Sequence, residues 1–341
     1  MTISILFLSD THLGFDCPSR PRVDRRRRCE EFFANFERAL AAACNLSVDL
    51  VIHGGDVFFR SRVRREIVEE TIKRLRTVTK AGIPIYIVPG NHERSALPCP
   101  LLWQEENIFV FDEARTYLFE KSGIKLALAG FPYSRETMAT NFRPLVEGTK
   151  YGQHKTQARL LCFHHIVESS IVGPKNYQFR HGKDVIPLSV FPNDFAALLT
   201  GHIHTFQILT KDIDGSTLPT PVYYPGSTCR TSFAEKLETK GFLILTLEGT
   251  ECGKGQILDW EFHSLPSRPM EDLTLALGLK RAEFTEKVQN ILSQLHEDSI
   301  VRLTIDDLQE NAPQWLTSAY LRELAPKTMN VDLRWPRKSA S

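Results

Sequence analysis

The chain contains 341 residues, of which 42% are hydrophobic and 24% are charged, and its formal net charge is +1. This length allows one large domain and a smaller appended one, and the near-neutral charge excludes a uniformly basic nucleic-acid binder. We find no apolar run long enough to cross a membrane, no export signal and no paired cysteine spacing, so we expect a cytoplasmic protein that does not bind membranes.

Short apolar runs alternate with helical patterns through the first half of the chain. The expected elements are strands at 3–8, 50–52 and 83–88 and helices at 28–44 and 68–79. In the first helix, Phe32, Phe36 and Leu40 fall on one face, and Gly82 marks the end of the second. Strands joined by crossover helices predict a layered α/β domain.

The second half is richer in strands and turns. Strands are expected at 126–129, 160–163, 196–200, 222–224, 242–247 and 257–262, with scarce helical signal between them. Pro266 and Pro269 indicate a boundary within 264–270. Beyond it, a small α/β unit is predicted from helices at 282–295 and 315–324 and strands at 300–305 and 329–333. We therefore predict two domains, 1–265 and 266–341.

Five polar motifs each begin where a predicted strand ends. They are Asp10-Thr11-His12, Gly55-Asp56, Gly90-Asn91-His92-Glu93, His164-His165 and Gly201-His202-Ile203-His204. In layered α/β sheets, ligands collect at the carboxyl ends of the strands, so motifs that are distant in sequence can converge. Each motif alone is weak, because a single histidine at a strand end is more often structural. Their ordered combination is specific.

The residue types in these motifs match a pair of divalent transition metals. Imidazole provides affinity, and carboxylate or amide oxygens complete the coordination. Asp10 and Asp56 are the only anionic candidates, so two divalent ions would leave a centre with excess positive charge. Such a centre suits an anion, and phosphate esters fit, because paired metals both lower the pKa of a bridging water and bind phosphoryl oxygens.

These motifs, in this order, resemble the calcineurin-like metallophosphoesterase superfamily, whose pattern is DxH, GD, GNH, H and GHxH. The resemblance covers about residues 1–262 and implies an α/β/β/α sandwich with a small C-terminal α/β cap that helps to position DNA. The longer strings HGGDVF at 53–58, VPGNHERS at 88–95 and YPGSTCRTSFAEK at 224–236 are similar to the nuclease subunit of SbcD-type DNA repair complexes.

The resemblance also implies roles for the polar residues. It assigns Asp10, His12 and His204 to one metal, Asn91, His164 and His202 to the other, and Asp56 to both. His92 takes the catalytic position, where it stays off the metals and protonates or orients the leaving oxygen. The family favours manganese, and the same ligands would also accept iron, zinc, nickel or magnesium.

Three neighbouring residues have roles that the motifs leave open. We choose His164 over His165 as the ligand, because relatives have one ligand directly after the apolar run. His53 is interpreted as a packing or supporting residue rather than a ligand. Glu93 either accepts hydrogen bonds beside the ligands or is a solvated loop acid, and the sequence does not separate these two interpretations.

Two arginine clusters follow the first two metal motifs. The candidate substrate-binding residues within them are Arg26, Arg27, Arg28, Arg60, Arg62 and Arg64. Located near one rim, they would neutralise backbone phosphates of a polynucleotide. The alternative is that they are solvated charges at helix starts, paired with Glu30, Glu31, Glu66 and Glu69.

We therefore expect a metal-dependent DNA exonuclease or endonuclease that uses a metal-bound hydroxide in DNA repair or processing. The alternatives are a phosphodiesterase or phosphatase acting on a small nucleotide-like ester, and a non-catalytic scaffold subunit. DNA is the expected partner. An SMC-like coiled-coil ATPase stays open, because little sequence follows the C-terminal unit for the helical segment that would grip it, and a homodimer is also allowed.

Overall fold

The structure, a computed structural model, describes residues 1–276, 280–306 and 313–335. The chain forms two compact units. The first comprises Met1–Cys17, Arg28–Thr231 and Leu237–Pro266, and the second comprises Pro18–Arg27, Ser232–Lys236 and the chain from Ser267 onward. Two short segments of the first predicted domain thus belong to the second unit, which local sequence patterns do not reveal. No helix within the described ranges has both the length and the apolar character needed to span a membrane.

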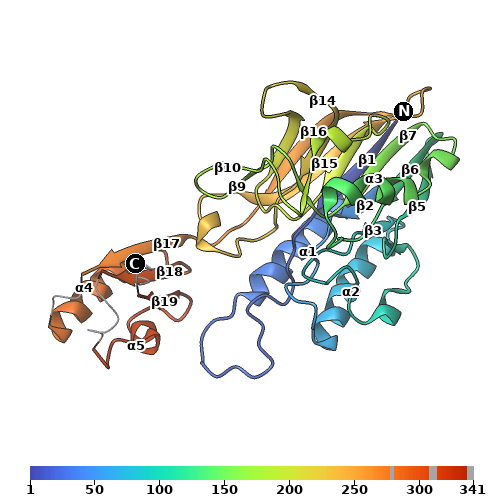
Figure 1. Cartoon of the computed structure of the whole chain (residues 1–341). Coiled ribbons are helices and arrows are strands. Elements are labelled where there is room, and N and C mark those ends of the chain that lie inside the picture. The colour runs from blue at the N-terminus through green and yellow to red at the C-terminus, as the bar shows by residue number, and fades with distance from the viewer. Residues whose placement is uncertain (277–279, 307–312, 336–341) are drawn as a thin grey trace. The chain divides into compact units, whose positions relative to one another are not determined.

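The first sheet of the larger unit contains most of the strands predicted in the first half. Its order is β16 (Gln256–Leu265), β15 (Lys240–Glu248), β1 (Thr2–Leu8), β2 (Leu50–His53), β3 (Ile85–Ile87) and β4 (Ile108–Val110). Strands β1 to β4 are parallel, whereas β15 and β16 pair antiparallel. The helices α1 (Cys29–Asn45) and α2 (Arg65–Thr79) connect the parallel strands and lie beside each other (Figure 1).

The second sheet also contains both parallel and antiparallel strands. Its order is β13 (Gln207–Lys211), β14 (Thr217–Tyr224), β12 (Ala197–Thr200), β7 (Ala158–Phe163), β6 (Ile124–Gly130) and β5 (Arg115–Lys121). The four central strands are parallel and the two outer strands are antiparallel. Short two-stranded ladders, β8 (Ile166–Val167) with β11 (Val185–Ile186) and β9 (Ile171–Val172) with β10 (Tyr177–Gln178), occupy the connection between β7 and β12.

A helix between β6 and β7 departs from the prediction of scarce helical signal. This helix, α3 (Met138–Gly148), has Pro144 in its interior and buries only Met138, Phe142 and Val146. Three apolar residues four positions apart form a narrow stripe, and proline lowers helix propensity, so the sequence signal was weak. The helix nevertheless packs its stripe against Phe131 and Phe163 of the second sheet region.

Alternation along the strands explains why the unit is layered. In β1, Ile3, Ile5 and Phe7 enter the apolar layer shared by the two sheets, whereas Leu6 and Leu8 contact the layer that contains α1 and α2. Successive strand residues point to opposite faces, so a strand that is apolar throughout must be covered on both sides. The layers are therefore helix, sheet, sheet and helix, which confirms the predicted α/β/β/α sandwich.

Within its described residues, the smaller unit contains a parallel three-stranded sheet and two helices. Its strands are β17 (Met270–Leu275), β18 (Ile300–Ile305) and β19 (Asn330–Arg334), and its helices are α4 (Arg281–Gln294) and α5 (Ser318–Glu323). Phe284, Leu292 and Leu321 pack with Val301 of the central strand. Strand β17 was not predicted, because only Met270 and Leu275 of that strand are buried and its polar residues resemble the preceding boundary segment.

Candidate metal centre

Each of the five polar motifs directly follows the end of a strand, as the sequence predicted. Strands β1, β2 and β3 run parallel in the first sheet, and β7 and β12 run parallel in the second. Their carboxyl ends meet at one place in the larger unit. The structure brings together all seven predicted ligands there: Asp10, His12, Asp56, Asn91, His164, His202 and His204.

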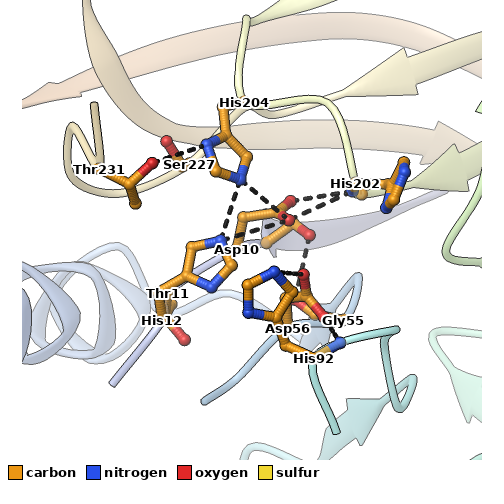
Figure 2. A network of polar contacts seen from close by, with 12 residues as sticks. Asp10, Thr11, His12, Gly55, Asp56, His92, His202, His204, Ser227 and Thr231 are labelled. Atoms are coloured by element: carbon orange, nitrogen blue, oxygen red, sulfur yellow. Dashed lines mark hydrogen bonds and ion pairs between the residues drawn. The ribbon is translucent and has the colours of Figure 1, made fainter. Parts of the chain in front are cut away.

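One group of donors consists of Asp10, His12 and His204. The Nε2 atoms of His12 and His204 lie 2.9 Å apart, and Oδ1 of Asp10 lies 3.9 Å and 3.8 Å from them (Figure 2). Asp10 and His12 are fully buried. Three donor atoms directed at one another from β1 and from the loop after β12 form a compact set for one ion.

The second group consists of Asn91, His164 and His202. Oδ1 of Asn91 lies 3.0 Å from Nε2 of His164 and 2.8 Å from Nδ1 of His202. Oδ2 of Asp56 lies 3.4 Å from Nε2 of His164, and Oδ1 of Asp10 lies 4.0 Å from the same nitrogen. The two groups are therefore contiguous, and the carboxylates of Asp10 and Asp56 lie where they join.

Hydrogen bonds define which nitrogen of His164 is available. Its Nδ1 atom lies 2.7 Å from the carbonyl oxygen of Gly54. A carbonyl oxygen only accepts, so Nδ1 must carry a proton and donate it. Nε2 is then directed at Asp56 and Asn91, and its lone pair is available to a metal once its own proton is lost.

His53 is fully occupied by hydrogen bonds and cannot bind a metal in this arrangement. The backbone N–H of Gly55 donates to its Nδ1 at 3.2 Å, so the proton lies on Nε2. Thr11 donates its hydroxyl to the carbonyl of Val57 at 3.0 Å and accepts from Nε2 of His53 at 3.0 Å. Burial lowers the pKa of His53 to about 3, so the ring is neutral and supports the loop after β1.

His165 also lies outside the cluster of donor atoms. Its Nε2 accepts from the backbone N–H of Ser134 at 3.0 Å, and its ring stacks on Tyr133 with centroids 4.7 Å apart. Burial holds the pKa of His165 well below its usual value. Its neighbour His164 therefore provides the donor atom from this motif.

Glu93 accepts hydrogen bonds beside the ligands and is not a solvated loop acid. Its carboxyl group is buried and accepts from the backbone N–H of Phe58 at 2.6 Å and of Gly90 at 2.8 Å. These bonds join the loops that carry Asp56 and Asn91. Burial, together with the charge of Asp56, raises the pKa of Glu93 to about 8.

The charges of the cluster test whether it suits divalent cations. Burial lowers the pKa values of His12 and His202, the latter to about 3, so both are neutral lone-pair donors at neutral pH. Burial opposes ionisation of Asp56, but His164 holds its pKa well below the usual value. His12 and His202 are thus neutral imidazoles, whereas burial lowers the pKa of His164 but Asp56 overrides this and raises it to about 9, so that ring must lose a proton before it can bind a metal. Together with an amide oxygen and carboxylates at short range, these imidazoles fit two hard-to-borderline divalent ions.

Four of the seven donors have strained backbone conformations. The φ angles of Asp10, His12, Asp56 and His202 are 51°, 45°, 52° and 80°, in the left-handed region that side chains rarely adopt. Close approach imposes a second constraint, because a Cβ atom on Gly90 would lie 2.2 Å from Oδ1 of Asp56. Strain that clusters at ligand positions is typical of a functional site.

The predicted substrate-binding arginines fall into two classes. Arg28 is 8% exposed and donates to Glu31 and to the carbonyl of Arg230, each at 2.6 Å. In the second unit, Arg26 pairs with Asp298 and Arg27 donates to the carbonyl of Val23 at 2.6 Å. By contrast, the loop after Asp56 carries three exposed arginines, Arg60, Arg62 and Arg64.

Tyr133 is a neighbour of the donors that sequence reasoning missed, and its ring lies 6.2 Å from that of His202 and nearly parallel to it. The residue belongs to no metal motif, and aromatic residues are common in any α/β domain. Its position was nevertheless informative, because Tyr133 follows the carboxyl end of β6 as the ligands follow the ends of their strands.

Comparisons with known proteins agree with this geometry. A family model described as calcineurin-like phosphoesterase matches residues 3–206. A DNA double-strand break repair protein Mre11 from Methanosarcina mazei is 26% identical over 89% of this chain and 45% of its own length. Mre11 from Methanococcus maripaludis is 24% identical over 96% of this chain and 82% of its own length.

A third relative is described only as the uncharacterized metallophosphoesterase YhaO of Bacillus subtilis. It is 25% identical over 94% of this chain and 75% of its own length. The chain spans about half the length of the Methanosarcina relatives, 45% in M. mazei and 48% in M. acetivorans.

Proposed function

The chain belongs to the calcineurin-like phosphoesterase family, and we propose that this metallophosphoesterase is a nuclease that hydrolyses phosphodiester bonds of DNA. The observation that carries the proposal is the convergence of seven buried or half-buried metal donors from both sheets at one place. Similarity to Mre11 proteins over most of the chain supports DNA as the substrate and a role in DNA repair.

The proposed centre holds two divalent ions, with manganese the first candidate. Asp10, His12 and His204 would hold one, Asn91, His164 and His202 the other, and Asp56 would contact both. When bound, the ions would supply the Lewis acidity that acidifies a water molecule and would offset the negative charge of the phosphoryl group. The protein contributes the fixed positions of these donors and the exclusion of bulk water around Asp10 and His164, which are fully buried.

His92 is the proposed proton donor to the leaving oxygen. It is half-buried at the edge of the donor cluster, with Nε2 3.8 Å from Oδ2 of Asp56. Its Nδ1 is committed to the carbonyl of Phe59, so Nε2 is the atom that faces the reaction. A general acid at this position would protonate the departing alkoxide as the phosphorus–oxygen bond breaks.

The surroundings of the centre favour a polynucleotide over a small ester. The loop that begins with Asp56 continues into Arg60, Arg62 and Arg64, none of which is buried. The guanidinium of Arg60 lies 5.5 Å from the ring centroid of Phe59, whose carbonyl holds His92. Cations beside a hydrolytic centre suit a substrate with several phosphates, and such contacts are independent of base sequence.

The direct test is incubation of the purified protein with manganese and end-labelled single- and double-stranded DNA. We expect cleavage by the wild type and by His154→Gln, a control histidine outside the donor cluster. Asp56→Asn and His92→Gln should lose cleavage. Equal cleavage by wild type and Asp56→Asn would exclude the proposed mechanism.

Two further outcomes decide between the remaining functions. Hydrolysis of a cyclic or mononucleotide ester without any cleavage of DNA would establish the small-substrate alternative. A protein that takes up no transition metal would favour the scaffold alternative. An SMC-like ATPase partner and a homodimer stay predictions, which co-purification and light scattering of the full chain would test.

A further inference from the structure

An open hollow of about 530 Å³ lies in the larger unit next to the donor cluster. The residues in its lining that bear on binding are Arg94, Tyr133, Ser134, Arg135 and Glu136. Arg94 follows the Asn91-His92 motif by two residues, and the other four follow the end of β6. The hollow is therefore bordered by two loops at the same sheet edges as the metal donors.

Tyr133 forms the wall between the hollow and the donors. Its ring is inclined by 22° to that of His202, with centroids 6.2 Å apart, and lies 6.5 Å from that of His164. The backbone around it is fixed on three sides. Ser95 donates its hydroxyl to the Tyr133 carbonyl, the Tyr133 N–H donates to Pro89 at 2.9 Å, and Ser134 binds His165.

Three polar side-chain groups in the lining of the hollow have no hydrogen-bond partner among the residues that the structure describes. Neither the guanidinium of Arg94 nor that of Arg135 forms a hydrogen bond or an ion pair with any residue that the structure describes, and both are exposed. Within the same described ranges, the hydroxyl of Tyr133 also has no hydrogen-bond partner. Arg28, by contrast, donates to Glu31 and to the carbonyl of Arg230.

Two cations and one anion, Glu136, line the hollow, so its ligand should carry negative charge. The volume exceeds that of a phosphate group alone, and the partly exposed ring of Tyr133 offers an apolar, planar surface. Charge recognition by arginine together with a stacking surface is the combination used by proteins that bind single-stranded nucleic acid.

We propose that this hollow binds the nucleotide adjoining the scissile phosphate of a single-stranded DNA, with its phosphate at Arg94 and Arg135 and its base against Tyr133. The inference rests on the proposed nuclease function and specifies single-stranded DNA as its substrate. A base in a duplex is stacked on its neighbours and cannot lie against a protein ring, so the subsite requires an unpaired nucleotide.

The test compares two substrates in manganese: a thymidine decanucleotide, which fills the subsite, and bis(p-nitrophenyl) phosphate, which has a single phosphate. The variants are Arg94→Ala, Arg135→Ala and Tyr133→Leu. Tyr133→Phe keeps the ring and removes only the hydroxyl. Lys80→Ala is the matched control, because Lys80 follows α2 and precedes β3, at the opposite end of the sheet.

We expect each of the first three variants to raise KM for the decanucleotide roughly tenfold more than for the small ester, with Tyr133→Phe close to wild type. Lys80→Ala should have the same effect on KM for both substrates. Equal losses on both substrates would show that these residues only support the metal centre, and no loss on either would also overturn the subsite. Thermal unfolding of each variant controls for misfolding.

The design separates failure of the subsite from failure of the proposed function. If the wild type hydrolyses the small ester but cleaves neither the decanucleotide nor double-stranded DNA, the nuclease function is refuted and the subsite with it. If it cleaves double-stranded DNA but not the decanucleotide, the subsite alone is refuted. If the wild type cleaves both the decanucleotide and the small ester and the variants show no selective loss, the nuclease function stands and the subsite alone is refuted.

Discussion

The imidazole of His92 donates its Nδ1 proton to the carbonyl oxygen of Phe59, 2.7 Å away. This hydrogen bond fixes both the ring orientation and the tautomer, because the carbonyl can only accept. Nε2 is therefore the single nitrogen that can exchange a proton with a substrate. Phe59 follows Asp56 in the same loop, so the position of the proposed proton donor and that of the Asp56 carboxylate are coupled.

We predict that His92→Gln lowers kcat for phosphodiester hydrolysis by about 10²- to 10⁴-fold, because the general acid is lost. Nε2 of His92 lies at the edge of the donor cluster, so metal content should stay near that of the wild type. Steady-state kinetics together with elemental analysis would measure both quantities. Loss of one metal in the variant would instead identify His92 as a ligand.

Metal binding should stabilise the protein. Ions that bind the folded chain only, at a free concentration of about 100 times Kd, add about 2.7 kcal/mol to the free energy of unfolding. We expect manganese to raise Tm and a chelator to reverse the shift. Asp10→Asn, which weakens a fully buried carboxylate donor, should reduce the response, whereas Asp259→Asn on the exposed edge strand should not. An identical Tm with and without metal would contradict the site.

The stability of the metal-free protein should depend on pH through His164. Burial lowers the pKa of His164, but the Asp56 carboxylate overrides this effect and raises it to about 9. A raised histidine pKa gives stability that is complete below about 6.5 and is lost as pH rises to about 9. Burial raises the pKa of Glu93 to about 8. The contribution of Glu93 to stability is therefore also lost as pH rises, between about pH 4.5 and pH 8.

We therefore expect Tm of the chelator-treated protein to fall between pH 7 and pH 9, and His164→Gln to remove part of that slope. Differential scanning calorimetry at constant ionic strength would measure it. Bound metal should reduce the slope as well, because it displaces the His164 proton. A flat profile in the metal-free wild type would show that the His164–Asp56 pair does not form as described.

Gly90→Ala should abolish metal uptake. The added Cβ would lie 2.2 Å from Oδ1 of Asp56 and 2.5 Å from its backbone nitrogen, so the carboxylate loop must move. Gly152→Ala is the matched control, because nothing lies within 4 Å of the corresponding Cβ position and its φ is not positive. Manganese titration followed by calorimetry would compare them. Normal binding by Gly90→Ala would indicate that the loop is more adaptable than its contacts imply.

The arginines should separate by role. Arg28→Ala removes bonds to Glu31 and Arg230 and two cation–ring interactions at 5.2 Å and 5.6 Å, and we expect a decrease of about 2 kcal/mol in stability. Arg60→Ala and Arg62→Ala should leave stability unchanged and weaken binding of single-stranded DNA. Removing one cation that neutralises a phosphate should reduce the slope of log K against log salt by about 0.7. If the salt dependence of binding is unchanged in both variants, the DNA does not contact Arg60 or Arg62.

The sequence was most informative for elements that pack against a neighbouring layer along their whole length. Strand β1 and helices α1 and α2 were predicted to within a few residues, because their apolar residues recur at the period of their structure. Helix α3 was missed, since its burial rests on three residues around an internal proline. Antiparallel β13 was also missed, because only Leu209 of that strand is buried.

The convergence of the seven donors was predicted from a rule about strand ends, and the structure brings them together. What surrounds them was less accessible to sequence reasoning. The tautomer of His53 is fixed by a hydrogen-bond chain through Thr11 to the carbonyl of Val57. The burial of Arg28 depends on the carbonyl of Arg230, about two hundred positions further along the chain. Hydrogen bonds of this kind produce no periodic pattern in the sequence.

The donors are divided between two sheets, and this division has a consequence for biosynthesis. Asp10, Asp56 and Asn91 follow strands of the first sheet, whereas His164, His202 and His204 follow strands of the second. A ribosome-bound chain therefore cannot assemble a complete centre until the segment through His204 has emerged and both sheets have stacked. Partly synthesised molecules are inert by construction, and hydrolytic capacity arises only with the finished architecture.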